Sequence, residues 1–235
     1  MDLYVLNSDF EQIALIDDYR SFIWAKRYYQ FGDCELYIRA CAEYMDILRK
    51  GHFLIRNDDD MICRIEKLEL DTDAEDGNFL IVTGVDCRNI LNQRVIWDQT
   101  NFTGTVEEYI HTLVANNLTN PDLPERKFDN FYLGELKGLP ATISEQVTYN
   151  PLGDKIIELC TAYQYGSRVR IDENNRLIFE VYAGEDRSYE QDKNNFVVFT
   201  PDFDNIISSK YISDATNVKN VAIVAGEGEG VERKR

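Results

Sequence analysis

The sequence is poor in the residues that most often carry catalysis or bind metals. It has two histidines, His52 and His111, and five cysteines, none in a Cys-x-x-Cys arrangement. No Ser-His-Asp or His-Cys signature surrounds either histidine, so the pattern does not indicate a nucleophilic or metal site. We expect two ordinary surface histidines, and cysteines that are mostly small buried hydrophobic residues in a reducing compartment.

Proline and glycine are also scarce, at 5 and 13 of 235 residues, which excludes fibrous and low-complexity chains. No apolar run approaches the roughly 18 residues of a membrane span. The first ten residues lack the basic and apolar regions of a secretory signal. We therefore expect a globular chain without membrane insertion, retained in the cytoplasm or exported without a cleaved signal.

Positive charge is the minority charge. Asp and Glu number 42 against 25 Lys and Arg, the formal net charge is −17, and the longest basic run is Arg233-Lys234-Arg235. A field of this sign repels phosphate backbones and anionic lipids, which disfavours nucleic-acid binding and membrane-surface roles. Such a chain can still surround DNA without holding it.

What the sequence does contain is strand-forming residues, including 14 Tyr and 12 Phe. Period-two alternation predicts short strands at residues 3–7 and 11–16. Residues 21–40 alternate on both sides of Phe31-Gly32-Asp33 and predict a hairpin, with strand character from Ser21 to Tyr29. A short helix is expected over Glu43–Arg49, closed by Gly51.

Two longer helices are marked by their ends. Thr105 and Glu108 form a capping box that predicts a helix start. For the second helix, Asn150 is the predicted cap, Pro151 suits the first helical position, and Gly166 suits the stop. Strands are therefore expected to dominate both ends of the chain, with the helices between them.

The segment between these helices, residues 119–150, is rich in breakers and predicts loops with one short strand, at a domain junction or an insertion. After the second helix, Glu173-Asn174-Asn175 is expected to turn between two strands of a hairpin. Three further strands are predicted in residues 194–200, 205–214 and 220–228.

Acidic loops raise the question of metal binding. The loop Asp71–Gly77, between expected strands Met61–Leu70 and Asn78–Val85, has its glycine one place too late for an EF-hand, and Val82 stands where the bidentate Glu belongs. Asn57-Asp58-Asp59-Asp60 is better interpreted as a hydrated loop than as a cation site. Gly226–Gly230 lacks the Lys and Ser/Thr of a phosphate loop and is interpreted as a turn. We therefore predict no catalytic, cofactor-binding or metal-binding residue and no cofactor.

One enzymatic hypothesis stays open. With 42 acidic residues, some carboxylate pair lies at a separation suited to glycoside hydrolysis by chance alone. An acid–base enzyme is therefore the second hypothesis, and a carbohydrate-binding β module using the many tyrosines is the third.

The order of several segments resembles the tail-hub proteins of long-tailed bacteriophages, which include the siphophage Gp37-like proteins and are related to the baseplate hub of contractile tails. The resemblance begins at GVDCRNILNQRVI, residues 84–96, and extends back to SFIWAKRYYQFGDCELYI, residues 21–38. Forward, it continues through residues 150–172, 176–188, 200–214 and 220–230. These are structural signatures and bring no active-site residues with them.

The resemblance implies an α+β, β-rich fold with tandem barrel-like β domains and a helix-bearing α+β part between them. The first barrel-like domain is then expected at residues 1–100, the α+β domain at 101–195, and the start of a second barrel-like domain at 196–235. Hub proteins usually continue beyond this point with more strands, so we expect an incomplete second barrel.

The function implied is structural. Such a hub joins the tail tube to the tip and the receptor-binding parts, lines the DNA exit channel, and is not an enzyme. The expected partners are two further copies in a homotrimer, the distal tail protein, the tape measure protein and receptor-binding tail proteins, with DNA passing through unbound. The expected location is the virion tail tip, after assembly in the bacterial host cytoplasm. A tail-associated cell-wall hydrolase and a carbohydrate-binding module remain the alternatives.

Overall fold

The computed structural model describes residues 2–75, 77–206, 208–216, 218–221 and 226. The chain divides into two compact units, Met1–Gly184 and Glu185–Arg235. Each unit is described by itself below. The division into functional domains at residues 1–100, 101–195 and 196–235 stays a prediction.

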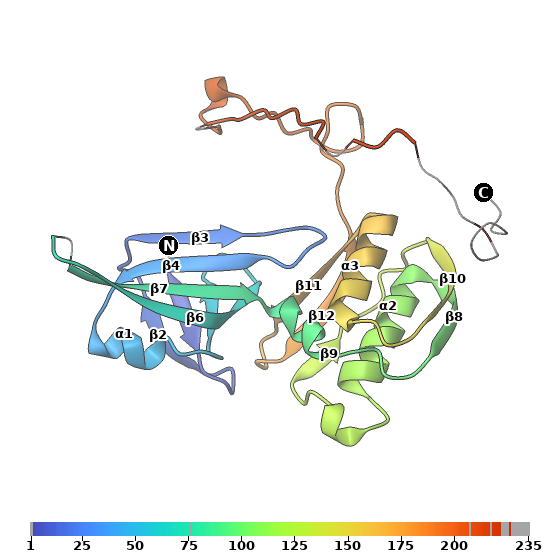
Figure 1. Cartoon of the computed structure of the whole chain (residues 1–235), viewed down its shortest axis with the longest axis horizontal. Helices are drawn as coiled ribbons and strands as arrows, with labels where there is room; N and C mark the ends of the chain where they lie inside the picture. The colour runs from blue at the N-terminus through green and yellow to red at the C-terminus, as the bar shows by residue number, and fades with distance from the viewer. Residues whose placement is uncertain (1, 76, 207, 217, 222–225, 227–235) are drawn as a thin grey trace. The chain divides into compact units, whose positions relative to one another are not determined.

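The first unit opens with a seven-stranded antiparallel sheet (Figure 1). In spatial order its strands are β2 (Gln12–Ile16), β1 (Leu3–Leu6), β5 (Phe53–Arg56), β6 (Ile62–Asp73), β7 (Gly77–Asp86), β4 (Asp33–Arg39) and β3 (Ser21–Ala25). In β4, Cys34, Leu36 and Ile38 are buried while the residues between them are more exposed, so the period-two pattern places one face on a core. The expected β-rich α+β fold class is confirmed.

The predicted hairpin of residues 21–40 forms between β3 and β4, but β3 ends at Ala25 rather than at Tyr29. The reason is a contact with residues that are distant in sequence. The hydroxyl of Tyr28 donates to the carbonyl of Gln164 at 3.1 Å and accepts the Gly184 amide at 2.6 Å, so this segment leaves the sheet.

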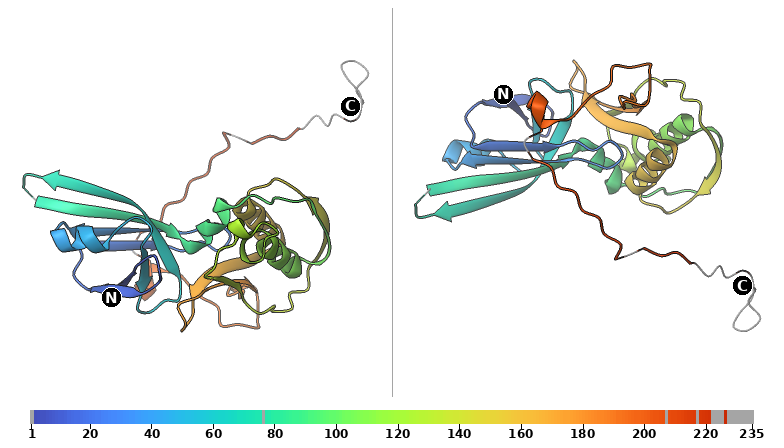
Figure 2. Two further views of the ribbon diagram at one scale, coloured as in Figure 1. Left: turned by 90° about the horizontal axis from the view of Figure 1, so that it is seen from below. Right: turned by 90° about the horizontal axis from the view of Figure 1, so that it is seen from above.

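The second predicted hairpin is longer than its sequence pattern suggested. The ladder of β6 and β7 runs from the Cys63–Asp86 pair to the Asp73–Gly77 pair, so Asp71 and Thr72 lie in a strand and not in the loop. The far end of this hairpin projects past the neighbouring strands (Figure 2).

A short helix, α1 (Ala42–Ile47), joins β4 to β5 and confirms the expected helical turn. The Cys41 thiol caps it by accepting the Tyr44 amide. Gly51 has φ 87° in the turn that follows, a conformation that glycine adopts without strain.

The helical half of the first unit contains α2 (Val106–Val114) and α3 (Leu152–Tyr163). The capping box of Thr105 and Glu108 is confirmed. The predicted ends of α3 are wrong. Pro151 occupies the cap position without a side-chain hydrogen bond, and the helix ends at Gln164, whose φ is 58°.

Two small sheets surround these helices. β8 (Thr100–Thr105) pairs with β10 (Thr142–Val147), while β11 (Tyr165–Ile171), β12 (Leu177–Ala183) and the parallel β9 (Phe131–Leu133) form the other. The expected hairpin around Glu173–Asn175 is confirmed as β11 and β12. Residues 119–150 hold two strands rather than one and lie inside the first unit.

The first unit has two hydrophobic cores. One lies on the sheet and includes Leu3, Leu36 and Val82. The other fills the space between α2, α3 and the three-stranded sheet, and extends to Phe10 and Phe53 at one end of the large sheet. Among the described residues, no helix is both long and apolar enough to cross a membrane.

The second unit has one regular element in its described part, a 3-10 turn at Pro201–Phe203 capped by the Thr200 side chain. The strands predicted at 194–200 and 205–214 do not form among the described residues. The strand at 220–228 and the glycine-rich 226–230 lie almost wholly outside them. An alternating sequence makes a strand only when a neighbouring strand accepts its hydrogen bonds. Here large apolar side chains stay exposed, namely Phe199, Phe203, Tyr211, Ile212, Val218 and Val221.

Candidate functional site

One of the two acidic loops of the sequence is paired with basic side chains. Asp58, Asp59 and Asp60 pair with three different cations, respectively Arg56, Lys26 and Arg168. In the other loop, the Asp73 carboxylate accepts the backbone amide of Glu75. In the part of the chain that the structure describes, no group of three or more His, Cys, Asp or Glu is placed to hold a metal.

The prediction of two ordinary surface histidines is wrong. His111 is 9% exposed on α2, its ring centre lies 6.2 Å from that of Phe179, and its Nε2 has no hydrogen-bond partner among the described residues. Burial lowers the pKa of His111, and the nearby Glu107 carboxylate only partly opposes this. His52 is half-buried, with its Nδ1 2.8 Å from the carbonyl of Ile47.

Four of the five cysteines are buried free thiols, as expected, and Cys41 is the exposed exception. Burial raises the pKa of Cys160 to about 11, and it also raises the pKa of Cys87. A raised pKa keeps a thiol protonated and unreactive. Cys160 and Cys87 therefore behave as packing residues rather than nucleophiles.

The most connected polar side chain of the first unit is one that the sequence did not single out, Arg88. It is 1% exposed. Its guanidinium donates two hydrogen bonds to the Asp86 carboxylate at 2.9 and 2.7 Å. It also donates to the carbonyls of Ser167 at 2.8 Å, Gln30 at 2.8 Å and Arg27 at 3.0 Å. Arg88 therefore ties the end of β7 to the segment after β3 and to β11.

The local sequence explains this geometry. Asp86 is the last residue of β7, and its Oδ1 accepts the Arg88 amide at 2.9 Å, which starts the 3-10 helix Cys87–Gln93. The turn directs the Arg88 guanidinium over the ring of Phe31, 5.4 Å from its centre. Charged residues are rarely buried, so the sequence analysis had no reason to place Arg88 in the interior. The sequence feature that could have indicated the Asp86–Arg88 pair is Asp-Cys-Arg at the end of an alternating strand.

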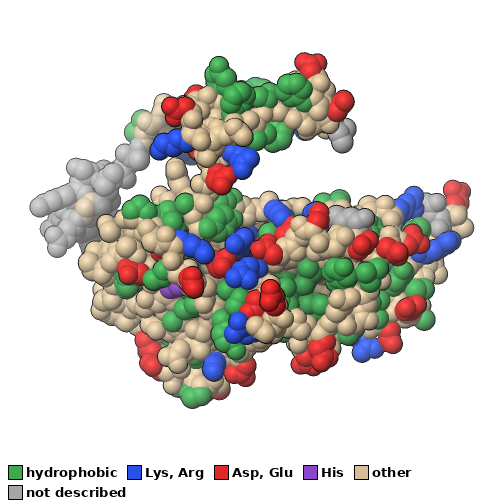
Figure 3. All heavy atoms as spheres, turned by 180° about the vertical axis from the view of Figure 1, so that it is seen from behind, with side chains coloured by type: hydrophobic (Ala, Val, Ile, Leu, Met, Phe, Trp, Pro, Cys, Tyr) green, Lys and Arg blue, Asp and Glu red, His purple; other side chains and the backbone are tan. Residues whose placement is uncertain are grey.

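A second group of ion pairs lies on β11 and β12. Glu180 on β12 is 4% exposed and accepts from Arg168 at 2.8 Å and from Arg170 at 3.2 Å. Burial by itself raises the pKa of Glu180, but the two arginines outweigh it and hold this pKa below its usual value. Basic and acidic side chains lie side by side across the middle of the first unit in Figure 3.

This cluster, which we call the Arg88 joint, comprises Asp86, Arg88, Arg168, Arg170 and Glu180. Each of these charged groups has a partner of opposite charge within 3.5 Å. None of them is left as a free general acid or base beside a nucleophile. The arrangement is suited to holding the sheet and the helical half together.

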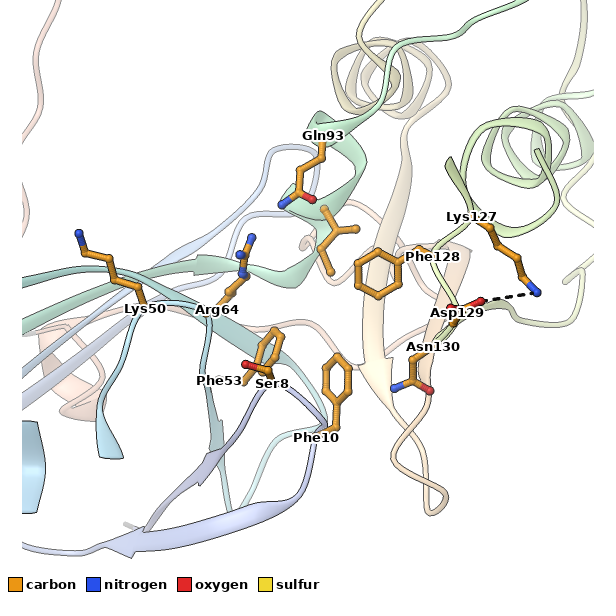
Figure 4. A pocket seen from close by; sticks show the side chains of 12 residues that line it. Ser8, Phe10, Lys50, Phe53, Arg64, Gln93, Lys127, Phe128, Asp129 and Asn130 are labelled. Carbon is orange, nitrogen blue, oxygen red and sulfur yellow. Dashed lines mark ion pairs between the residues drawn. The ribbon is translucent and has the colours of Figure 1, made fainter. Parts of the chain in front are cut away.

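A cavity of about 560 Å³ lies on a different part of the first unit (Figure 4). Phe10, Phe53 and Phe128 form its apolar wall, and Phe10 and Phe53 are stacked with ring centres 4.7 Å apart. Lys50 and Arg64 line it on the sheet side, with the Lys50 amine pointing away from the rings. We call it the aromatic–basic cavity. The cavity could not be predicted from local sequence patterns, because its residues come from distant segments.

The two edge strands of the large sheet carry exposed apolar residues. Ile13 and Leu15 on β2 are 41% and 48% exposed, and Ile23 on β3 is 59% exposed. An edge strand offers free backbone hydrogen-bonding groups to another chain, and exposed apolar side chains strengthen such pairing. Both edges are therefore candidate assembly surfaces.

Comparison with known protein families identifies the chain. Residues 2–235 match the family described as Siphovirus ReqiPepy6 Gp37-like protein. The chain belongs to the siphovirus Gp37-like family. The resemblance noted in the sequence is thereby confirmed. No curated protein matches the chain significantly.

Solved structures similar to this Gp37-like chain include two bacterial tail proteins. The prophage tail protein gp18 from Listeria monocytogenes EGD-e superposes with a TM-score of 0.52 at 14% identity, over 76% of this chain and 50% of that one. The tail protein from Neisseria meningitidis MC58 gives a TM-score of 0.49 at 11% identity, over 75% and 49%. The gp18 likeness shows a shared fold, and this chain spans about half the length of both structures.

Proposed function

We propose that this Gp37-like chain is a structural component of a phage or prophage tail tip, a tail hub that joins the tail tube to the tip and the receptor-binding parts. The observation that carries the proposal is the family match over residues 2–235. The fold shared with a prophage tail protein supports it. The Arg88 joint also fits a structural role, because its charges are paired with one another.

The proposed assembly is a homotrimer that contacts the distal tail protein, the tape measure protein and receptor-binding tail proteins. The exposed apolar residues of β2 and β3 support an assembly, because pairing with neighbours removes free strand edges. The exposed apolar side chains of the second unit support it too, because an interface would remove them from water. Assembly would take place in the host cytoplasm.

The negative charge has a role in this proposal. A channel wall rich in Asp and Glu repels the phosphates of DNA and lets it pass without being held. Replacing acidic residues that face the channel by Lys is then expected to slow DNA release. Ejection kinetics of the variant particles measure this, and unchanged kinetics would refute the role.

Immunogold electron microscopy tests the location. Antibody to the purified chain is applied to particles induced from the source organism, with a strain lacking the gene as the control. Gold at the distal tip of tails is the expected result. Unlabelled tails, with the protein free in the lysate, would contradict a hub and favour a soluble wall hydrolase or a carbohydrate-binding module.

A further inference from the structure

The aromatic–basic cavity is built from five separate parts of the first unit. Ser8 and Phe10 come from the turn between β1 and β2, Lys50 and Phe53 from the approach to β5, and Arg64 from β6. The 3-10 helix after β7 contributes Ile90 and Gln93, and the segment before β9 contributes residues 127–130. A strand-edge role in assembly does not require this cavity.

Its polar and apolar groups are separated in space. In Figure 4, Lys50 and Arg64 lie on one side, while Phe10, Phe53 and Phe128 line the middle. On the other side, the Lys127 side chain points away from the rings toward Asp129. Its Nζ lies 3.9 Å from Oδ1 of Asp129. The Lys50 amine likewise points away from the rings in Figure 4, so a ligand is offered aromatic residues beside Arg64, with Lys50 at the rim.

The Arg64 side chain is 32% exposed, and its Nη1 lies 3.3 Å from Oε1 of Glu66. Arginine offers five N–H donors, so a pair of this kind leaves donors for a second carboxylate. Lys50 is exposed and adds a second positive charge at the same side. Both residues therefore bring positive charge to one side of the cavity in a chain whose net charge is −17.

The volume limits the ligand. A cavity of about 560 Å³ is within the roughly 300–1,000 Å³ range of sites for small ligands and single peptide anchors. An aromatic ring packs favourably against other rings with centres about 4.5–7 Å apart. A long polyanion is disfavoured by the charge of the whole chain, whereas one or two carboxylates beside a ring suffer much less repulsion.

We propose that the aromatic–basic cavity binds a short acidic peptide segment of a partner protein. The aromatic side chain of that segment packs beside Phe128 and the Phe10–Phe53 stack, and its carboxylates face Arg64, with Lys50 at the rim. The partner is thus recognised by an acidic–aromatic–acidic sequence. This binding is independent of the position of the chain in a tail.

Calorimetric titration of the full chain with acetyl-Gly-Asp-Phe-Asp-Gly-amide tests the proposal at about 50 mM salt, where charge contacts are weakly screened. We expect binding at one site. Replacing both peptide aspartates by Asn, or the Phe by Ala, should each weaken it about tenfold, since charge-assisted contacts and a buried ring contribute comparably.

Two protein variants complete the design. Lys50→Gln combined with Arg64→Gln should weaken binding at least about tenfold, because both cations are removed. Lys67→Gln is the matched control, since Lys67 is an exposed cation on β6 that pairs with Glu69. Circular dichroism establishes that each variant is folded. The proposal would be overturned if the Lys50→Gln, Arg64→Gln double variant bound the peptide as tightly as the Lys67→Gln control. Equal binding of the parent peptide, its Asn version and its Ala version would also overturn it, as would no binding at millimolar peptide. Tighter binding of inorganic phosphate than of the peptide would also overturn it.

Discussion

Arg88 shows how much one buried charge depends on its surroundings. Removing a guanidinium from water is costly, and it is tolerated here because a carboxylate and three backbone carbonyls accept its donors. The same contacts hold three segments that are far apart in sequence. A polar side chain that links the sheet to the helical half is therefore as important to the first unit as a core leucine.

Arg88→Met is expected to destabilise the chain by about 3–5 kcal/mol, because it leaves the buried Asp86 carboxylate without its partner. Urea unfolding followed by circular dichroism measures this. Arg49→Met is the matched control. Arg49 pairs with Asp46 on the surface, so its loss should cost about 0–1 kcal/mol. Equal costs for the two variants would show that Arg88 is not the link described here.

His111 predicts a pH dependence of stability. Its pKa in the folded chain lies below the ordinary value of 6.5, so below pH 6.5 the unfolded chain binds more protons at this residue. The free energy of unfolding should therefore fall as the pH drops from about 6.5 through the lowered pKa. Urea midpoints at several pH values measure the slope. In His111→Gln the slope over this range should be smaller, and an unchanged slope would assign it to other groups.

At the level of secondary-structure elements, the junction of α3 and β11 shows why the helix stop was predicted at Gly166, two residues after the observed cap Gln164. Gln164 takes the left-handed conformation that glycine usually supplies. Gly166 is needed for a different reason. A Cβ built there would lie 2.6 Å from the Tyr182 ring and 2.7 Å from the Tyr28 ring. Two aromatic side chains thus require the glycine, which the sequence pattern assigned to the helix end.

This difference can be tested with two substitutions. Gly166→Ala should destabilise by about 1–3 kcal/mol, because the added methyl group overlaps both rings. Gln164→Gly should stabilise the chain by about 0.5–1 kcal/mol. Glycine removes the strain of the left-handed conformation, and this gain exceeds the greater backbone entropy that glycine loses on folding. Thermal and urea unfolding measure both. If Gly166→Ala stabilised the chain and Gln164→Gly destabilised it, this account of the two residues would be wrong.

At the scale of the whole molecule, the two units differ in how they satisfy their apolar residues. The first unit buries them in two cores. In the second, Phe199, Phe203 and Tyr211 are 70%, 66% and 91% exposed. Such exposure in a β-prone sequence is typical of a segment that is completed by another chain or by further sequence.

Limited proteolysis should therefore separate the units. Chymotrypsin is expected to cut first at exposed aromatic residues between Tyr189 and Tyr211 and to leave residues 1–184 intact, because cleavage needs backbone that opens locally. Mass spectrometry of a time course identifies the cuts. Tyr149 in the first unit is the internal control. Its side chain is exposed, but its backbone amide donates to the Ile96 carbonyl, so the backbone there should resist cleavage. Early cleavage at Tyr149 would contradict the prediction, and protection of the second unit in intact tails would support assembly.

Part of the local structure could be predicted from neighbouring residues alone. The alternation in Asp33–Arg39 and Gly77–Asp86 and the Thr105–Glu108 capping box depend on neighbours a few residues away, so they were predictable. Tertiary structure decided the rest. It buried Arg88 and His111, shortened β3 through Tyr28, and brought Phe10, Arg64 and Phe128 to one cavity. These outcomes depend on contacts between residues distant in sequence, whose free energy no local pattern records.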